Sequence, residues 1–247
     1  MNHPIIGILW GMWPYASLRA YRLFLEISHQ YANGGNHDFP HLLIDNIPVR
    51  ELTDNTESRD LTVSQVRTEY LRLKWAGVNI FLMACNTMHL YLDEIYDPSS
   101  DTCMYISLID TVSDHIVSRQ YTRVGILGTM NTIKSHLYDQ TLSERWLTPI
   151  VLRDQAILQK INSIIQKGIS GVSWDVWDKD ILIQALQYLE QAWAECLILG
   201  CTELPLAYED IISPLPFFDP LLLSIEKVCA IYYERLSSRE LISSEKL

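Results

Sequence analysis

The sequence predicts an α/β protein of two pseudo-symmetric domains, each a parallel sheet covered by helices, with the active site in the cleft between them. Short, continuous apolar runs alternate with longer segments whose apolar residues recur at helical spacing, which is typical of parallel strands buried between helices. The chain also repeats itself, because residues 6–12 (IGILWGM) align without gaps with residues 124–130 (VGILGTM). Cys85 and Cys201 each follow three bulky apolar residues and a small one, and each precedes polar residues. These repeats predict two similar domains.

In the first half, we expect strands at the short apolar runs and helices between them. Residues 33–35 (NGG) end the first long helix and Gly77 ends the second, because glycine readily adopts the left-handed conformation that closes a helix. Asp110 and Thr111 are expected to cap the helix that follows them, since their side chains can accept a hydrogen bond from its first turn. The expected strands are residues 5–9, 42–44, 78–84 and 105–108, and the expected helices are residues 15–32, 63–76 and a short helix that ends at residue 95.

The second half repeats this alternation of strands and helices. The expected strands are residues 124–127, 150–152, 196–199 and 217–218. The expected helices are residues 155–167, which Gly168 would end, residues 181–194 and residues 220–236. We expect the first domain to comprise residues 1–115 with 214–247, and the second to comprise residues 116–213.

Composition excludes several classes of protein. With 48% hydrophobic and 20% charged residues, the 247-residue chain is predicted to be globular, and a net charge of −11 argues against a nucleic-acid partner, which needs a basic surface. Five cysteines without a CxxC pair predict reduced thiols and a cytoplasmic location. Residues 4–18 are apolar but lack preceding basic residues, so we predict a buried strand there and no signal peptide. No uncharged apolar run reaches the roughly 18 residues of a membrane span.

The two matched thiols suggest proton transfer. Ligands of open α/β sheets bind at the carboxyl ends of the strands, where both thiols fall, and we expect the helix after each thiol to lower its pKa from about 8.5. One thiolate could then remove the Cα proton of an amino acid while the other thiol returns a proton on the opposite face. A thiol hydrolase or transferase would instead need one activated cysteine with a base partner. The other cysteines, Cys103, Cys196 and Cys229, are expected to be inert apolar residues.

Polar residues beside the thiols are candidates for holding a substrate. Amide or hydroxyl donors at helix starts, where backbone N–H groups also converge, are Asn86, Thr87, Thr129 and Thr202. His89 either orients the site or is a packed, capping histidine. Glu203 is either a helix-start acid or holds a site residue in place. Arg50 follows the second strand, and it either binds a side-chain carboxylate through its forked guanidinium or is a solvated surface residue.

Several motifs resemble one known family. Residues 85–89 (CNTMH) and 200–203 (GCTE) resemble the signatures of the aspartate/glutamate racemase family, whose members use no PLP and have two pseudo-symmetric α/β halves. Further segments that resemble the family are residues 7–14 (GILWGMWP), 47–50 (IPVR), 124–129 (VGILGT) and 218–220 (FDP). The similarity therefore spans nearly the whole chain.

The resemblance implies a cofactor-independent amino-acid racemase without a metal, in which Cys85 and Cys201 are the acid/base pair. It implies a small-molecule amino-acid substrate and a last helix that returns to the first half, and we expect a homodimer without nucleic-acid or membrane partners. The residues implied near the substrate are Met12, Arg50, Asn86, Thr87, Thr129 and Thr202. A lysine of the family would align with Lys167, or with Lys160 if the alignment is shifted. His89 and Glu203 are expected to support this site.

The chain also departs from the family pattern. Trp10 and Trp13 stand where the family has glycines, and they either reshape the pocket or cover a dimer contact, unless Trp13 packs outward. Because Arg50 is retained, we predict an acidic substrate, aspartate or glutamate. The alternatives are a racemase or isomerase of another small amino acid or acid, and a non-catalytic ligand-binding protein, which the presence of both thiols disfavours.

Overall fold

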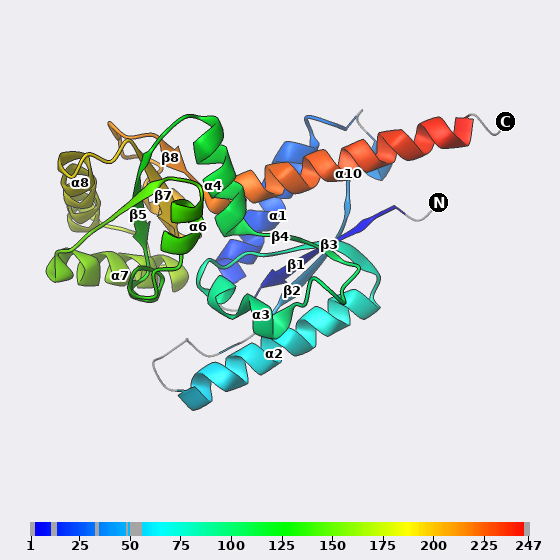
Figure 1. The fold of residues 1–247 in the computed structure, drawn as a ribbon, viewed down its shortest axis with the longest axis horizontal. Helices are drawn as coiled ribbons and strands as arrows, with labels where there is room; N and C mark the ends of the chain where they lie inside the picture. Colours follow the sequence, from blue (N-terminus) through cyan, green and yellow to red (C-terminus); the bar gives the residue numbers. More distant parts are fainter. Residues whose placement is uncertain (1–2, 11–13, 33–34, 48, 50–55, 245–247) are drawn as a thin grey trace. The chain divides into compact units, whose positions relative to one another are not determined.

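The computed structural model describes residues 3–10, 14–32, 35–47, 49 and 56–244 (Figure 1). The chain forms two compact units. The first comprises Met1–Ala84, Tyr91–Ser107 and Ser224–Leu247, and the second comprises Cys85–Leu90 and Leu108–Leu223. Each unit contains one four-stranded parallel sheet, which confirms the predicted fold class of two parallel-sheet α/β halves.

The sheet of the first unit has the strand order β2-β1-β3-β4. Its strands are β1 (Ile5–Trp10), β2 (His41–Asn46), β3 (Val78–Met83) and β4 (Met104–Ile106). The central strands β1 and β3 are mostly buried, as expected for parallel strands covered on both faces. A Cβ on Gly7 would lie 2.8 Å from Cγ1 of Val78, so the glycine leaves room for that side chain between the strands.

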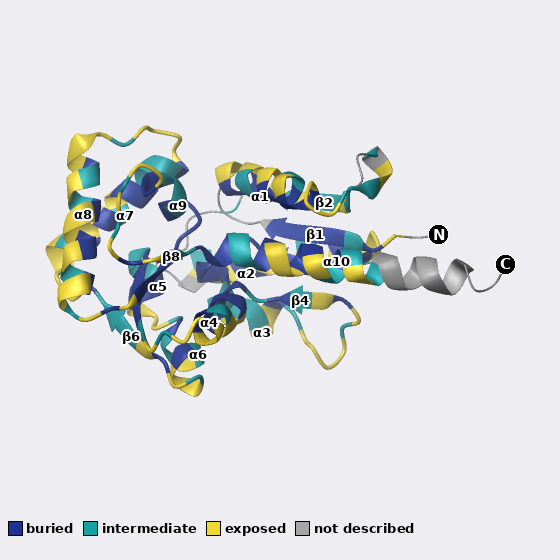
Figure 2. Ribbon diagram, turned by 90° about the horizontal axis from the view of Figure 1, so that it is seen from above, coloured by how far each residue is buried: buried dark blue, intermediate teal, exposed yellow. Residues whose placement is uncertain are grey.

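The helices of the first unit are α1 (Pro14–Ser28), α2 (Thr56–Trp75), α3 (Leu92–Ile95) and most of α10 (Pro220–Ser244), with a 3₁₀ turn, η1 (Asn36–Asp38). Buried and exposed residues alternate along residues 220–235 of α10 at helical spacing (Figure 2). Its buried Cys229 Sγ lies 3.9 Å from Ser28 Oγ at the end of α1, and the Tyr233 ring stacks on Tyr31. The last helix therefore packs against residues of the first unit.

The sheet of the second unit has the strand order β6-β5-β7-β8, which matches the order of the first sheet strand for strand. Its strands are β5 (Arg123–Gly128), β6 (Thr148–Val151), β7 (Cys196–Gly200) and β8 (Phe217–Phe218). Because β8 pairs with β7, residues 217–218 belong to this sheet, whereas the expected boundary at residue 214 would put them in the first domain. The helix of residues 108–118 also lies in the second unit.

The helices of the second unit are α4 (Leu108–Ser118), α5 (Met130–Lys134), α6 (Asp139–Glu144), α7 (Gln155–Ile169), α8 (Val176–Gln191) and α9 (Leu204–Ala207), with the 3₁₀ turn η2 (Thr87–Tyr91) beginning in it. The amphipathic faces of α7 and α8 are buried at helical spacing. The expected segments at 155–167 and 181–194 located both helices, but the short helices α5 and α6 were not predicted. Thr132 of the candidate site lies in α5, and Tyr138 directly precedes α6 as its N-cap.

The predicted end of α7 is wrong. Gly168 lies inside the helix, and a Cβ there would lie 2.6 Å from Trp174 Cζ2, so the glycine serves packing. The helix closes at Gly171, whose φ is 69°. The Gly171 N–H donates to the Gly168 carbonyl at 3.0 Å and the Val172 N–H to the Lys167 carbonyl at 2.9 Å, which is the bonding of a Schellman motif.

The predicted cap of α4 is also wrong. The helix begins at Leu108, so Asp110 and Thr111 lie within its first turn, and the preceding strand ends at Ile106. The Leu108 N–H donates to the His89 ring at 3.1 Å, so a side chain distant in the sequence satisfies one of the helix's unpaired N–H groups.

Candidate functional site

Both predicted thiols lie just beyond the carboxyl ends of strands. Cys85 comes two residues after β3, and Cys201 directly follows β7. The segment Cys85–Leu90 belongs to the second unit, so the two thiols are parts of one compact unit. Cys85 is half-buried and the Cys201 residue is 8% exposed, while all five cysteines are free thiols.

The environment of both sulfurs favours the neutral thiol. Burial raises the pKa of Cys85 to about 12, with a further increase from the Glu203 charge, although the N–H groups of Met88 and Thr87 act in the opposite direction. Burial likewise raises the pKa of Cys201 well above its ordinary value, and the charge of Glu203 and its hydrogen bond to the thiol add to this. The expected lowering of the thiol pKa by helix starts is therefore wrong. Loss of hydration outweighs the few N–H groups of these short turns.

Glu203 is the direct partner of Cys201. The thiol donates to Glu203 Oε2 at 2.9 Å, and the Thr202 hydroxyl donates to the same oxygen at 2.9 Å. Glu203 is only 3% exposed, so this carboxylate acts at short range and with little screening by water. Of the two interpretations that the sequence left open, the structure favours the one in which Glu203 holds a site residue.

His89 fixes the turn that carries Cys85. Its Nδ1 lies 2.9 Å from the Cys85 carbonyl oxygen and 3.1 Å from that of Asn86, while Nε2 accepts the Leu108 N–H. Nδ1 therefore carries the single ring proton. Burial lowers the pKa of His89 to about 4, so the imidazole is neutral at physiological pH. The structure supports the packed, capping role among the alternatives for this residue.

Asn86 lies beside a tyrosine that the sequence analysis did not single out. Asn86 is 2% exposed, and its Oδ1 accepts a hydrogen bond of 2.6 Å from the hydroxyl of Tyr138, which is 1% exposed. Asn86 Nδ2 is buried without a hydrogen-bond partner within the part of the chain that the structure describes. A buried N–H group of this kind can donate to a ligand.

Three threonine hydroxyls form a short chain in the second unit. Thr129 is the N-cap of α5 and accepts from the Thr132 N–H at 3.2 Å. The Thr132 hydroxyl lies 3.0 Å from that of Thr129 and 3.2 Å from that of Thr87. The structure thus joins two predicted site residues through Thr132, which sequence reasoning missed. The only sequence signal was its spacing of three from a capping threonine.

Lys167 lies at the end of α7 and pairs with two acidic residues. Its Nζ lies 2.7 Å and 2.8 Å from the two carboxylate oxygens of Asp178 and 3.4 Å from Asp175 Oδ2. Asp175 and Asp178 also form the capping box of α8. Hydrogen bonding to Asp178 raises the pKa of Lys167. Contact of Lys167 with a substrate stays a prediction, and the alternative, Lys160, is an exposed residue of α7.

Other predicted residues lie outside the described part of the chain. These are Met12, Trp13 and Arg50, together with the side chain of Trp10. Their proposed roles stay predictions.

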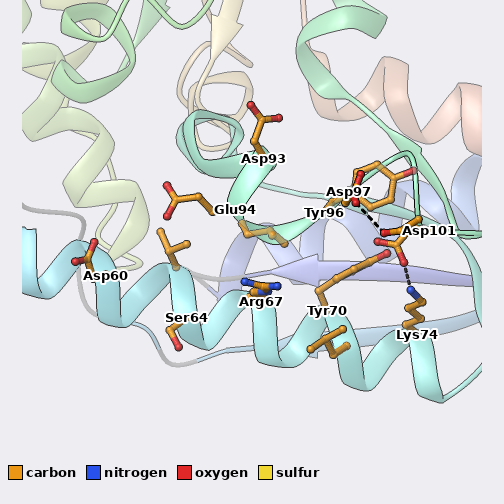
Figure 3. A pocket seen from close by; sticks show the side chains of 14 residues that line it. Asp60, Ser64, Arg67, Tyr70, Lys74, Asp93, Glu94, Tyr96, Asp97 and Asp101 are labelled. Carbon is orange, nitrogen blue, oxygen red and sulfur yellow. Dashed lines mark hydrogen bonds and ion pairs between the residues drawn. The ribbon is translucent and has the colours of Figure 1, made fainter.

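A groove of about 500 Å³ lies in the first unit between α2 and residues 93–101 (Figure 3). Its charged lining includes Asp93, Asp97 and the ion pair of Lys74 with Asp101, but none of the predicted site residues. Within the described ranges no cluster of three His, Cys, Asp or Glu side chains could hold a metal ion. Within those same residues no helix is long and apolar enough to cross a membrane.

Comparison with known proteins identifies the family. A profile of the Asp/Glu/Hydantoin racemase family matches residues 9–228. The chain belongs to this family. It is an amino-acid racemase, a class to which its similar relatives also belong by name.

Individual relatives match over nearly the whole chain. The broad specificity amino-acid racemase RacX of Bacillus subtilis is 25% identical over 219 residues, which cover 87% of this chain and 92% of that protein. PH1733, an aspartate racemase homologue from Pyrococcus horikoshii with a crystal structure, is 28% identical in sequence and has a TM-score of 0.76. The match covers 94% of this chain and 99% of that protein. Glutamate racemase from Francisella tularensis, whose crystal structure contains D-glutamate, is 17% identical in sequence. Its TM-score of 0.66, over 95% of this chain and 82% of that protein, shows a shared fold.

Proposed function

We propose that the protein interconverts the L- and D-forms of an acidic amino acid, aspartate or glutamate, by proton transfer between Cα and two cysteines. The observation that carries the proposal is the pair of free thiols, half-buried Cys85 and buried Cys201, which lie just beyond the carboxyl ends of β3 and β7 and belong to one compact unit. Such a pair supplies one base and one acid, as racemisation requires. We also infer a cytoplasmic homodimer, for which the reduced thiols and the family resemblance are the support.

The mechanism must create a thiolate although burial disfavours one. The proton of Cys201 is already hydrogen-bonded to Glu203, so its transfer to Oε2 would leave a thiolate beside a neutral carboxylic acid. The thiolate then takes the Cα proton, and the electron pair of the broken C–H bond spreads into the substrate carboxylate. The Cys85 thiol gives its proton to the opposite face of Cα and becomes a thiolate. In the reverse direction Cys85 is the base and Cys201 is the acid.

Groups near the thiols can stabilise the negative charge on the substrate carboxylate. Asn86 Nδ2 and the hydroxyls of Thr87 and Thr129 are the proposed donors, because preorganised donors act strongly where water is excluded. Thr202, whose hydroxyl donates to Glu203 Oε2, is proposed to border the substrate without donating from that hydroxyl. We propose that Met12 also borders the substrate, and that Arg50 and Lys167 bind its side-chain carboxylate. A forked guanidinium at position 50 favours a carboxylate over a neutral side chain.

Similarity to a broad specificity racemase favours a second candidate, a racemase that also accepts neutral amino acids. A screen of the common chiral amino acids in D₂O, read by chiral chromatography and by mass spectrometry for deuterium at Cα, separates the two. We expect the highest kcat/KM for aspartate or glutamate and deuterium in both enantiomers. Higher kcat/KM for neutral amino acids would support the second candidate, and no exchange with any amino acid would contradict both.

The screen includes a matched control for the thiols. Cys103→Ala removes a buried thiol of the first unit and should keep wild-type exchange, whereas loss of either site thiol should abolish racemisation. The assay contains no added PLP, and activity should survive treatment with hydroxylamine, which removes PLP from enzymes that depend on it.

A further inference from the structure

Tyr138 is held inside the second unit with its polar end against a site residue. It occupies the N-cap position of α6 but makes no side-chain cap, so its hydroxyl is available for other contacts. That hydroxyl donates to Asn86 Oδ1 at 2.6 Å across a separation of 52 residues. A short hydrogen bond between two buried side chains fixes the orientation of both.

The bond determines which end of the Asn86 amide is used. An asparagine amide has one acceptor oxygen and an NH₂ donor group, and the two ends exchange when the amide flips by 180°. Because Tyr138 donates to Oδ1, the NH₂ group must face another direction. There it is buried and has no hydrogen-bond partner among the described residues, so it is free to donate to a bound ligand.

We propose that Tyr138 is a positioning residue for racemisation: it locks the Asn86 amide so that Nδ2, and not Oδ1, faces the substrate carboxylate. This inference rests on the proposed function. The flipped amide would present an oxygen to the carboxylate and repel it. Tyr138 thereby makes the site selective for an anionic group at this position.

Two features keep the phenol protonated and in place. Burial raises the pKa of Tyr138 well above its ordinary value, and the Asp219 charge adds to the increase, so the hydroxyl keeps its proton. The residue before Cys201 leaves room for the ring, because a Cβ on Gly200 would lie 3.2 Å from Tyr138 Cε2. The glycine of the GCTE motif therefore helps to place the tyrosine that orients Asn86.

The test is a double-mutant cycle of Tyr138→Phe with Asn86→Ala, read as kcat and KM on the best substrate of the wild type. Tyr138→Phe keeps the ring and removes only the hydroxyl. We expect kcat/KM to fall about 10- to 100-fold, mainly through a higher KM, as for loss of one oriented hydrogen bond to a charged group. In the Asn86→Ala background the same substitution should change kcat/KM less than about twofold, because the group it orients is gone.

Tyr208→Phe is the matched control. Tyr208 is another buried tyrosine of the second unit, and its hydroxyl donates to the Leu182 carbonyl at 3.2 Å. Its substitution should leave KM unchanged even if the melting temperature falls as much as in Tyr138→Phe. Equal losses from Tyr138→Phe in both backgrounds, or an unchanged KM, would overturn the positioning role while wild-type racemisation stands. A wild type that racemises no amino acid would overturn the proposed function and this inference with it.

Discussion

Replacing His89 should make the stability of the protein less dependent on pH. The half-buried ring has a pKa of about 4 against 6.5 for an ordinary histidine, so the unfolded chain binds a proton more readily than the folded protein. The folded-state pKa is lowered, so the stabilisation is complete above pH 6.5 and is lost as the pH falls towards 4. The difference corresponds to about 3 kcal/mol of unfolding free energy in total, of which about 2 kcal/mol is lost between pH 7 and pH 5.

The perturbation is His89→Gln, whose amide retains a donor and an acceptor but does not titrate. Urea unfolding followed by tryptophan fluorescence at pH 7 and pH 5 gives the loss of unfolding free energy for each protein. The wild type should lose about 2 kcal/mol more than His89→Gln over this interval. His3→Gln, which changes an exposed histidine, should keep the full wild-type loss. Equal losses in wild type and His89→Gln would refute the assignment of a half-buried, neutral imidazole.

Further predictions concern the thiols, the substrate and packing. Cys85→Ser and Cys201→Ser should each lower the rate of racemisation by orders of magnitude, because each direction needs both groups. Either variant should still catalyse elimination from a β-substituted substrate, because elimination needs only one base. Near-wild-type racemisation by either variant would contradict the two-base mechanism. Arg50→Ala should lower kcat/KM for the acidic substrate, by an amount equivalent to about 2–4 kcal/mol of lost transition-state stabilisation. An unchanged ratio of aspartate to asparagine turnover would show that Arg50 does not select acidic over neutral substrates. Lys167→Met should raise KM for the acidic substrate about tenfold, whereas lower stability with unchanged KM would assign the lysine to its ion pair alone. Gly200→Ala should lower the free energy of unfolding by about 1–3 kcal/mol, measured with urea, because its Cβ would lie 2.8 Å from the Leu127 carbonyl oxygen.

Sequence patterns predicted most of the strands and the long helices. Strands such as β3 and β7 are uninterrupted apolar runs, and burial on both faces of a parallel sheet permits little else. The repeated context of Cys85 and Cys201 also predicted two similar halves, and both sheets have the same strand order. The ends of helices were harder to predict from the sequence, because Gly168 is as good a signal for the end of a helix as Gly171. Only packing against Trp174 explains why the first of these glycines remains helical.

For the site, the sequence by itself determined which groups are chemically capable, since the motifs at residues 85–89 and 200–203 contain the thiols, the amide and the carboxylate. It could not determine their protonation, because a pKa depends on burial and on charges brought near by folding. The sequence favoured thiolates, whereas burial raises the pKa of the Cys85 thiol and keeps it protonated. His89 is a neutral imidazole that fixes the turn carrying Cys85. Nor could it reveal Tyr138, whose contact with Asn86 joins residues 52 positions apart. Only the tertiary structure brings such a pair into hydrogen-bond distance, because chain spacing alone carries no information about long-range contacts.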